Sequence, residues 1–178
     1  RFIDNHDFAN DDYENRVEKR WGAARVNAAL VTLFTLDGVP LLYNGQEVAD
    51  TARHSIFGRA SINWANGDTA DGRARFAFCQ KLCALRKSEM ALTRGGVAWL
   101  DSDQPEAVLS YLRTCGHEKL MTVVNLTKVP VKVTLKGTGE AFKPLLSEGS
   151  TGGGQGLFEL SAYGYFVGKN ESGQAGDK

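Results

Sequence analysis

Four polar residues, Asp4–Asp7, follow the apolar residues Phe2 and Ile3 near the start of the sequence. Two carboxylates, an amide and an imidazole in one run supply strong hydrogen-bond acceptors and donors for a polar ligand. We interpret Phe2 and Ile3 as the end of a buried strand, and the polar run as groups presented where that strand leaves the core. Parallel sheets bind ligands at that edge. A turn or a helix cap is the alternative for such a run.

A second stretch, Val39–Glu47, has the same layout of apolar residues followed by polar ones. Between the two stretches, residues 16–36 carry apolar side chains at helical spacing, and the later half is apolar nearly all round, as in a covered helix. Gly38 and Pro40 predict the end of this helix. Residues 39–43 fit a strand buried on both faces of a parallel sheet. Strand, helix and strand would form a right-handed crossover with both polar ends on one side.

These two stretches resemble motifs of the α-amylase family of glycoside hydrolases. Residues 2–7 match the family's Phe-x-x-Asn-His-Asp motif at the end of the seventh barrel strand, and residues 38–47 match its Gly-x-Pro-x-x-Tyr-x-Gly-x-Glu motif on the eighth. The resemblance implies a fold of α/β plus all-β class. It consists of a partial (β/α)8 TIM barrel, strands 7 and 8 with their helices, followed by an antiparallel β-sandwich.

The resemblance also implies a reaction. Cleaving a glycosidic bond with retention needs two carboxyl groups about 5 to 5.5 Å apart. In the family a third carboxylate, that of the Asn-His-Asp motif, supports the transition state, and the neighbouring imidazole contacts the same sugar. These positions correspond to Asp7, as a catalytic residue, and His6, as a substrate-binding residue.

The family's nucleophile Asp and acid Glu lie on earlier barrel strands, and this sequence contains no stretch that corresponds to either. Since a barrel of eight strands needs about 250 residues, we predict that these 178 residues alone do not hydrolyse starch. We expect no cofactor within this chain. Calcium, which the family often binds, would be held by residues outside it.

Residues 44–69 form a connection of roughly 25 residues, far longer than the usual 2 to 6 or so. A loop of this length at the ligand end could line a substrate groove, for which Arg59 and Trp64 are the candidates. Trp64 could stack on a sugar ring or anchor the loop on the barrel. Residues 8–15 are polar without a clear period, which predicts another loop on the ligand side; Asp11, Asp12 and Glu14 would share it with Asp7.

A second helix is predicted over residues 72–90, with Asp68, Thr69 and Asp71 as N-cap candidates. Its predicted buried face holds Phe76, Cys79, Leu82, Cys83 and Met90, and its solvated side holds Arg73, Lys81 and Lys87.

At Arg94 the hydrophobic period changes from helical to alternating, which we take as the domain boundary. Residues 1–94 would form the barrel part, residues 95–168 the sandwich and residues 169–178 a disordered tail. Pro130 indicates an edge strand, and Gly149–Gly156 a flexible turn. Strands are predicted at residues 97–100, 107–114, 119–126, 129–135, 141–147, 157–161 and 163–167.

Lys plus Arg and Asp plus Glu both number 21, so the sequence lacks the basic footprint of a nucleic-acid-binding protein. We therefore expect no nucleic-acid partner, and we expect no membrane either; the family resemblance implies an α-glucan partner. No metal site is predicted, because no Cys or His cluster has ligand spacing. Cys79, Cys83 and Cys115 are interpreted as buried free thiols. The glycosylation patterns that begin at Asn125 and Asn170 are interpreted as chance matches.

Three alternatives to a hydrolase stay open at this point. One is a transglycosylase of the same family, and another is a catalytically inactive relative that binds carbohydrate or serves in assembly. In the third the sandwich itself is a carbohydrate-binding module, which requires solvent-facing aromatic side chains. The candidates for that face are Trp99, Tyr111, Tyr163, Tyr165 and Phe166. The sequence does not distinguish cleavage of α-1,4 from α-1,6 linkages.

Overall fold

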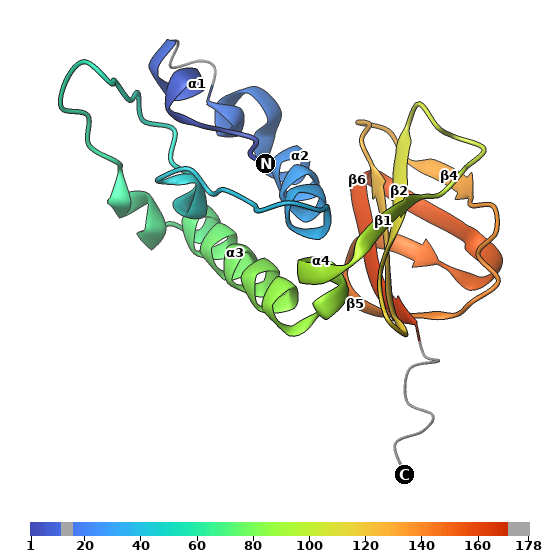
Figure 1. The fold of residues 1–178 in the computed structure, drawn as a ribbon. Coiled ribbons are helices and arrows are strands. Elements are labelled where there is room, and N and C mark those ends of the chain that lie inside the picture. Colours follow the sequence, from blue (N-terminus) through green and yellow to red (C-terminus); the bar gives the residue numbers. More distant parts are fainter. Residues whose placement is uncertain (12–15, 171–178) are drawn as a thin grey trace. The chain divides into compact units, whose positions relative to one another are not determined.

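The computed structural model describes residues 1–11 and 16–170 (Figure 1). The chain divides into two compact units. The first comprises Arg1–Phe34 and Gly38–Ala84, and the second Thr35–Asp37 and Leu85–Lys178. The first unit is built from helices and long irregular segments, and the second is built on a β-sheet. Among the described helices, none combines the length and the hydropathy that crossing a membrane requires.

Three α-helices shape the first unit. They are α1 (His6–Asp11), α2 (Val17–Thr35) and α3 (Ala70–Ser88), and the 3-10 helices η2 (Gln46–Val48) and η3 (Trp64–Asp68) lie in the long connection between α2 and α3. The bounds of α2 and α3 are within two residues of the predicted ones. Thr69 caps α3, since its Oγ1 accepts the Gly72 backbone N–H at 3.0 Å.

The two apolar stretches predicted as barrel strands are not strands in the structure. They are joined by two backbone hydrogen bonds: the Arg1 amino group donates to the Val39 carbonyl at 2.8 Å, and the Leu41 N–H donates to the Arg1 carbonyl at 2.9 Å. Arg1 thus bonds through its nitrogen to residue 39 and through its carbonyl to residue 41. Hydrogen bonds from one residue to two positions on either side of its neighbour are the pattern of parallel strands. The predicted burial is wrong, because Val39 is 81% exposed and Leu41 is 48% exposed. No further described strand flanks this pair and covers it.

The predicted apolar face of α3 is only partly buried. Cys79 and Leu82 are buried, whereas Phe76 is 46% exposed and Cys83 is exposed. Arg75 of the same helix is buried as well, although it is charged. It forms an ion pair with Glu18 of α2, and its Nε donates to Asn27 Oδ1 at 3.2 Å. Met90, the last predicted position, is 52% exposed and belongs to the next helix. A buried ion pair therefore replaces part of the apolar contact that the helical spacing predicted.

The second unit contains the short helix α4 (Met90–Arg94) and six antiparallel strands in one sheet. The strands are β1 (Gly96–Trp99), β2 (Val108–Cys115), β3 (Glu118–Asn125), β4 (Val131–Thr134), β5 (Phe142–Gly152) and β6 (Leu157–Asn170). Their order is β1-β2-β3-β6-β4, and β5 also pairs with β6. The antiparallel architecture and the places of the strands agree with the prediction. The structure differs in two ways: the last two predicted strands are one, and all six strands are joined in one sheet in place of the two separate sheets of a sandwich.

Strand β6 organises this sheet because it pairs with three partners. Its first part, from Leu157 to Leu160, pairs with β4, and its later part, from Tyr165 to Lys169, pairs with β3, while β5 runs along both. The sheet thereby surrounds one core made of Val108, Met121, Val123, Val133, Leu135, Phe158, Leu160 and Phe166. Pro130 directly precedes β4, which lies at the end of the strand order, as predicted.

Two predictions about the ends of these strands need correction. The glycine-rich segment 149–156 is not simply a flexible turn: it comprises the end of β5 and the 3-10 helix η4 (Gly154–Gly156). Gly149 has φ 56°, and a Cβ there would meet Ser161 Oγ at 1.9 Å, so the close approach of β5 and β6 requires glycine. Strand β6 continues through Asn170, and the rest of the predicted tail lies outside the described residues.

The aromatic side chains of the sheet do not form a solvent-facing row. Tyr111, Tyr165 and Phe166 are buried, whereas Trp99 is 63% exposed. The Tyr165 hydroxyl donates to Glu148 at 2.7 Å, and Trp99 packs edge-on against Tyr111. Since three of the five candidates belong to the interior, the sheet lacks the aromatic face that a carbohydrate-binding module would need.

The asparagines of the two glycosylation patterns serve the fold. The buried Asn125 side chain donates to the carbonyls of Val129 and Ser161 at 2.7 and 2.8 Å. The Asn170 side chain accepts the Lys119 N–H and donates to the His117 carbonyl. Both amides are thus engaged in hydrogen bonds within the sheet unit.

The three cysteines are free, but only Cys79 is buried; Cys83 is exposed and Cys115 is half-buried. Burial raises the pKa of the Cys79 thiol to about 11. At pH 8 the nucleophilic thiolate of Cys79 is therefore scarce.

We expect Cys83 to react rapidly with 5,5′-dithiobis(2-nitrobenzoate) at pH 8, and Cys79 to react only when the chain unfolds. Variants Cys79→Ser, Cys83→Ser and Cys115→Ser assign the absorbance phases to the three thiols, and urea should make all three equally fast. Equal rates for Cys79 and Cys83 in the folded chain would contradict this expectation.

Candidate functional site

The run Asp4–Asp7 is shaped by a helix cap. The Asn5 side-chain oxygen accepts the Phe8 backbone N–H at 3.1 Å, and the Asn5 carbonyl accepts the Ala9 N–H at 3.1 Å. Asn5 is therefore the N-cap of α1, since a capping amide oxygen satisfies a free N–H of the first turn. The predicted loop is wrong for residues 8–11, which belong to this helix. Asp12 and Glu14 lie outside the described residues.

His6 and Asp7 occupy the first turn of α1 and project into solvent. Their side chains are 61% and 65% exposed, and His6 Nε2 lies 3.2 Å from Asp7 Oδ1. The Asn5 amide nitrogen lies 3.5 Å from Asp7 Oδ2. A carboxylate at a helix N-terminus is favoured by the helix dipole. The two predicted site residues are thus adjacent and accessible to a ligand.

Behind this exposed pair lies a buried ionic network, which begins at Asp4. One Asp4 oxygen accepts the Asn5 N–H at 3.0 Å, and the other accepts Arg16 Nε at 3.0 Å; the side chains of Asp4 and Arg16 are fully buried. Burial raises the pKa of the Asp4 carboxyl, against the opposing effect of the Arg16 charge. Arg16 also lies 3.7 Å from Asp50 Oδ2. A single guanidinium therefore serves two buried carboxylates.

His54 continues the network toward the surface. Its Nε2 lies 3.0 Å from Asp50 Oδ2, its Nδ1 lies 3.2 Å from the Tyr43 hydroxyl, and Arg16 Nη1 lies 3.2 and 3.3 Å from the two ring nitrogens. In a neutral imidazole, these partners assign Nε2 as the donor to Asp50 and Nδ1 as the acceptor from Tyr43. Burial raises the pKa of Tyr43, so its hydroxyl keeps the proton that it donates.

The turn after the second apolar stretch holds Asp50 in place. Gly45 has φ 86°, and its carbonyl accepts the Val48 and Asp50 N–H groups at 3.1 and 2.9 Å. A Cβ on Gly45 would lie 2.8 Å from the Asp50 Cβ, so only glycine fits this close approach. The loop that follows is tied to α1, because the Ile56 N–H donates to Asn10 Oδ1 at 3.0 Å.

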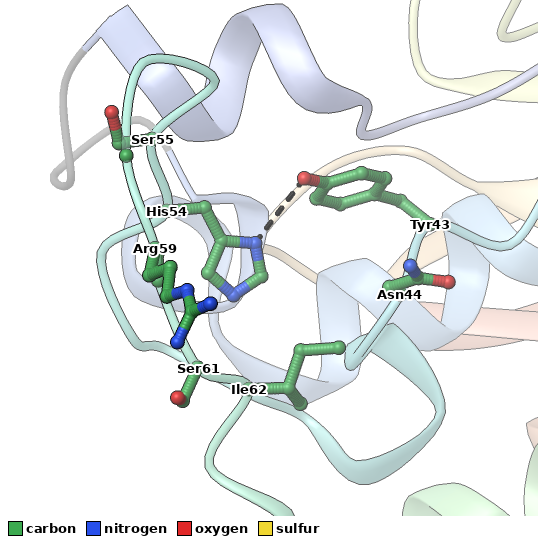
Figure 2. A pocket seen from close by; sticks show the side chains of 9 residues that line it. Tyr43, Asn44, His54, Ser55, Arg59, Ser61 and Ile62 are labelled. Carbon is green, nitrogen blue, oxygen red and sulfur yellow. Dashed lines mark hydrogen bonds between the residues drawn. The ribbon is translucent and has the colours of Figure 1, made fainter.

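The same loop borders a pocket of about 380 Å³ that is open to solvent. Figure 2 shows Ser55, Arg59 and Ser61 on one side of it, Tyr43 and Asn44 on the other, and His54 between them. The described residues that line it are Tyr43, Asn44, His54, Ser55, Gly58, Arg59, Ala60, Ser61 and Ile62.

The structure thus brings one of the two groove candidates, Arg59, together with Tyr43 and His54. The other, Trp64, begins η3, is 56% exposed and does not line the pocket; neither do His6 and Asp7. Within residues 1–11 and 16–170, no cluster of three or more His, Cys, Asp or Glu side chains is suited to a metal ion.

Sequence reasoning missed the network of Asp4, Arg16, Asp50 and His54. Its members lie up to 50 positions apart, and no single segment marks them as a set. The one local signal was the spacing of Asp50 and His54, which form an i,i+4 pair.

Comparison with known proteins gives consistent matches. Residues 98–167 match the family described as Maltogenic Amylase, C-terminal domain. The chain is 28% identical over 129 residues to a cyclomaltodextrinase of Geobacillus thermopakistaniensis, an alignment that covers 66% of this chain and 22% of the relative. It is 32% identical over 127 residues to a cyclomaltodextrin glucanotransferase of Thermoanaerobacterium thermosulfurigenes, which covers 70% of this chain and 16% of the relative.

Among solved structures, a noncanonic maltogenic α-amylase of Thermotoga neapolitana matches with a TM-score of 0.71 at 24% identity. The match covers 95% of this chain and 40% of the amylase chain. At this identity the likeness establishes the fold. The chain spans about a fifth of the length of the curated relatives that it matches, 22% of the cyclomaltodextrinase.

Proposed function

Because the chain belongs to the α-amylase family of glycoside hydrolases, we propose that it forms part of a retaining enzyme that acts on α-glucans such as starch and maltooligosaccharides. The observation that carries this proposal is the exposed pair of His6 and Asp7. Both residues match a family motif, and both are accessible on the first turn of α1.

In this proposal residues 1–94 are the C-terminal part of a TIM barrel, with Arg1–Ile3 and residues 39–43 as its seventh and eighth strands, and residues 95–168 are a β-sandwich domain. The two backbone hydrogen bonds that link Arg1 to residues 39 and 41 support a parallel pair. The exposed apolar side chains of Phe2, Val39 and Leu41 support the presence of further strands and helices in the complete fold.

Asp7 would assist a reaction whose nucleophile and acid lie elsewhere. As the sugar flattens toward an oxocarbenium ion, hydrogen bonds to its hydroxyls strengthen, and a charged acceptor makes the stronger bond. Asp7 supplies that acceptor, and the His6 imidazole beside it contacts the same sugar. Arg59 and Trp64 would line the outer part of the substrate groove. The Asn5 cap and the Asp4 network hold α1 in the position that this role requires.

Transfer to a sugar acceptor in place of water is the second candidate. It is favoured by the cyclomaltodextrin glucanotransferase among the relatives, whose identity to this chain is 32%. A catalytically inactive relative would lack the family's nucleophile or acid, and no stretch of this sequence corresponds to either residue.

The proposal is tested by assaying reducing-sugar release from amylose with two proteins. The purified 178-residue chain should release none, because Asp7 and His6 cannot cleave a glycosidic bond without the two principal carboxylates. The same chain, fused behind the part of the Geobacillus cyclomaltodextrinase that carries the nucleophile and the acid, should release sugar.

Two results would contradict this expectation. One is sugar release by the chain alone that disappears in Asp7→Ala. The other is a fusion that folds, as judged by circular dichroism, and binds maltooligosaccharide, yet neither hydrolyses nor transfers it.

A further inference from the structure

The pocket beside Tyr43 and His54 has a charge that the proposed reaction leaves unexplained. Arg59 lines it and forms no hydrogen bond or ion pair with any residue that the structure describes. Among the described residues, no Asp or Glu lines the pocket. An unpaired guanidinium on the wall of a polar pocket is suited to a carboxylate or a phosphate, because its planar fork matches two oxygens of either group.

The other lining groups can complete a set of donors around such an anion. Asn44, Ser55 and Ser61, which line the pocket with Arg59, contribute an amide and two hydroxyls (Figure 2). Neutral hydroxyl and amide groups bind phosphate and carboxylate oxygens as donors, and they also bind sugar hydroxyls as donors or acceptors.

The nearest buried carboxylates are engaged by other groups and do not line the pocket. Asp50 is fully buried behind His54 and is engaged by His54 Nε2 and by Arg16, and Asp4 is bound to Arg16 Nε. Arg16 Nη2, itself buried, has no hydrogen-bond partner among the described residues. The guanidinium behind His54 therefore offsets one of the two carboxylate charges, while Arg59 on the pocket wall has no ionic partner among the described residues.

The size of the pocket limits the range of ligands that can fill it. A volume of about 380 Å³ falls at the lower end of the range of small-molecule sites. It exceeds what a bare phosphate ion fills, and it can hold one sugar ring. The Tyr43 hydroxyl donates to His54, which leaves its oxygen free to accept a hydrogen bond from a ligand hydroxyl.

We propose that this pocket binds a monosaccharide-sized ligand that carries an oxyanion, either a phosphorylated sugar or a sugar carboxylate, with Arg59 as the residue that selects the anion. Arg59 contacts the oxyanion, and Tyr43 and Asn44 contact the sugar ring. The site needs neither Asp7 nor the missing carboxylates, so it can be tested on the chain as it is.

The test is isothermal titration calorimetry of the purified chain with glucose 6-phosphate, glucuronate, glucose and inorganic phosphate. At least one of the two charged sugars should bind with one molecule per chain. Its affinity should be at least about tenfold higher than that of glucose, which lacks the charge-assisted hydrogen bond to Arg59, and than that of inorganic phosphate, which lacks the contacts of the sugar ring. Binding of glucose 6-phosphate alone identifies the phosphate as the source of the anion, and binding of glucuronate alone identifies the carboxylate.

Two variants locate the site. Arg59→Gln should weaken binding of the charged sugar about tenfold or more, whereas Arg53→Gln should leave it unchanged, because Arg53 is exposed on the same loop but does not line the pocket. Binding of glucose with equal affinity, equal binding of inorganic phosphate, equal losses in the two variants, or no binding of any of the four would each overturn the proposal.

Discussion

Asp7→Asn is expected to lower kcat for maltooligosaccharide cleavage by about 10²- to 10³-fold in the fusion that supplies the nucleophile and the acid. The substitution keeps the shape of the side chain but removes its negative charge. A neutral amide makes a weaker hydrogen bond to the hydroxyls of a sugar that is gaining positive charge. Because the interaction strengthens in the transition state, kcat and kcat/KM should fall together.

The matched control for this prediction is Asp71→Asn, an exposed carboxylate in the first turn of α3. Both aspartates lie near a helix N-terminus, so the loss of a helix-dipole contact is common to the two variants. The thermal midpoints of the two variants should be alike, and only Asp7→Asn should show the lowered kcat. A full kcat in Asp7→Asn, or an equal loss in both variants, would remove Asp7 from the catalytic role proposed for it.

Local patterns were sufficient to predict the strands of the second unit. The alternation of Val131 and Val133 with polar residues, and the position of Pro130, are properties of a few neighbouring residues, and the structure places β4 at the edge accordingly. The helices α2 and α3 were predicted for the same reason. A cap such as Thr69 is set by the residue type and by the start of the apolar period.

The environment of the candidate site could not be predicted in this way. Burial of Arg16 is possible only because Asp4, Asp50 and His54, distant in the sequence, converge on it. Charged residues are rarely buried unless they are paired, so Arg16 in isolation predicts an exposed side chain. Helix α1 was missed because its polar sequence has no apolar period, although the capping capacity of Asn5 was readable.

Replacing Arg16 by methionine should have the largest effect on folding. Met is similar in length but uncharged, so the carboxylates of Asp4 and Asp50 would stay buried without their shared cation. Removing one partner of a buried ion pair costs about 3–5 kcal/mol, which is a large part of the stability of a unit of this size. We expect this loss in the free energy of unfolding of the first unit, followed by urea titration of the helical circular dichroism signal.

The loss of unfolding free energy in Arg16→Met should also depend on pH, and the pKa of Asp4 sets the direction of that dependence. Burial already raises the pKa of Asp4 above 3.8, and Arg16 opposes that rise. Without Arg16 the folded-state pKa rises further. A carboxyl whose pKa is raised in the folded state contributes stability below its unfolded pKa and loses it as the pH rises through the folded pKa. The difference between Arg16→Met and the unmodified chain should therefore shrink as the pH falls from 7 toward 4.

Two further variants separate this effect from a general loss of charge on the helix. Arg20→Met changes an exposed arginine of α2 and should alter stability by less than about 0.5 kcal/mol. The double variant Arg16→Met, Asp4→Asn has one unpaired buried carboxylate fewer than Arg16→Met. It should therefore recover part of the lost free energy of unfolding and show a weaker pH dependence. If Arg16→Met behaves like Arg20→Met at pH 7, the buried network contributes little, and α1 is held by its Asn5 cap and by the Asn10 contact with the loop.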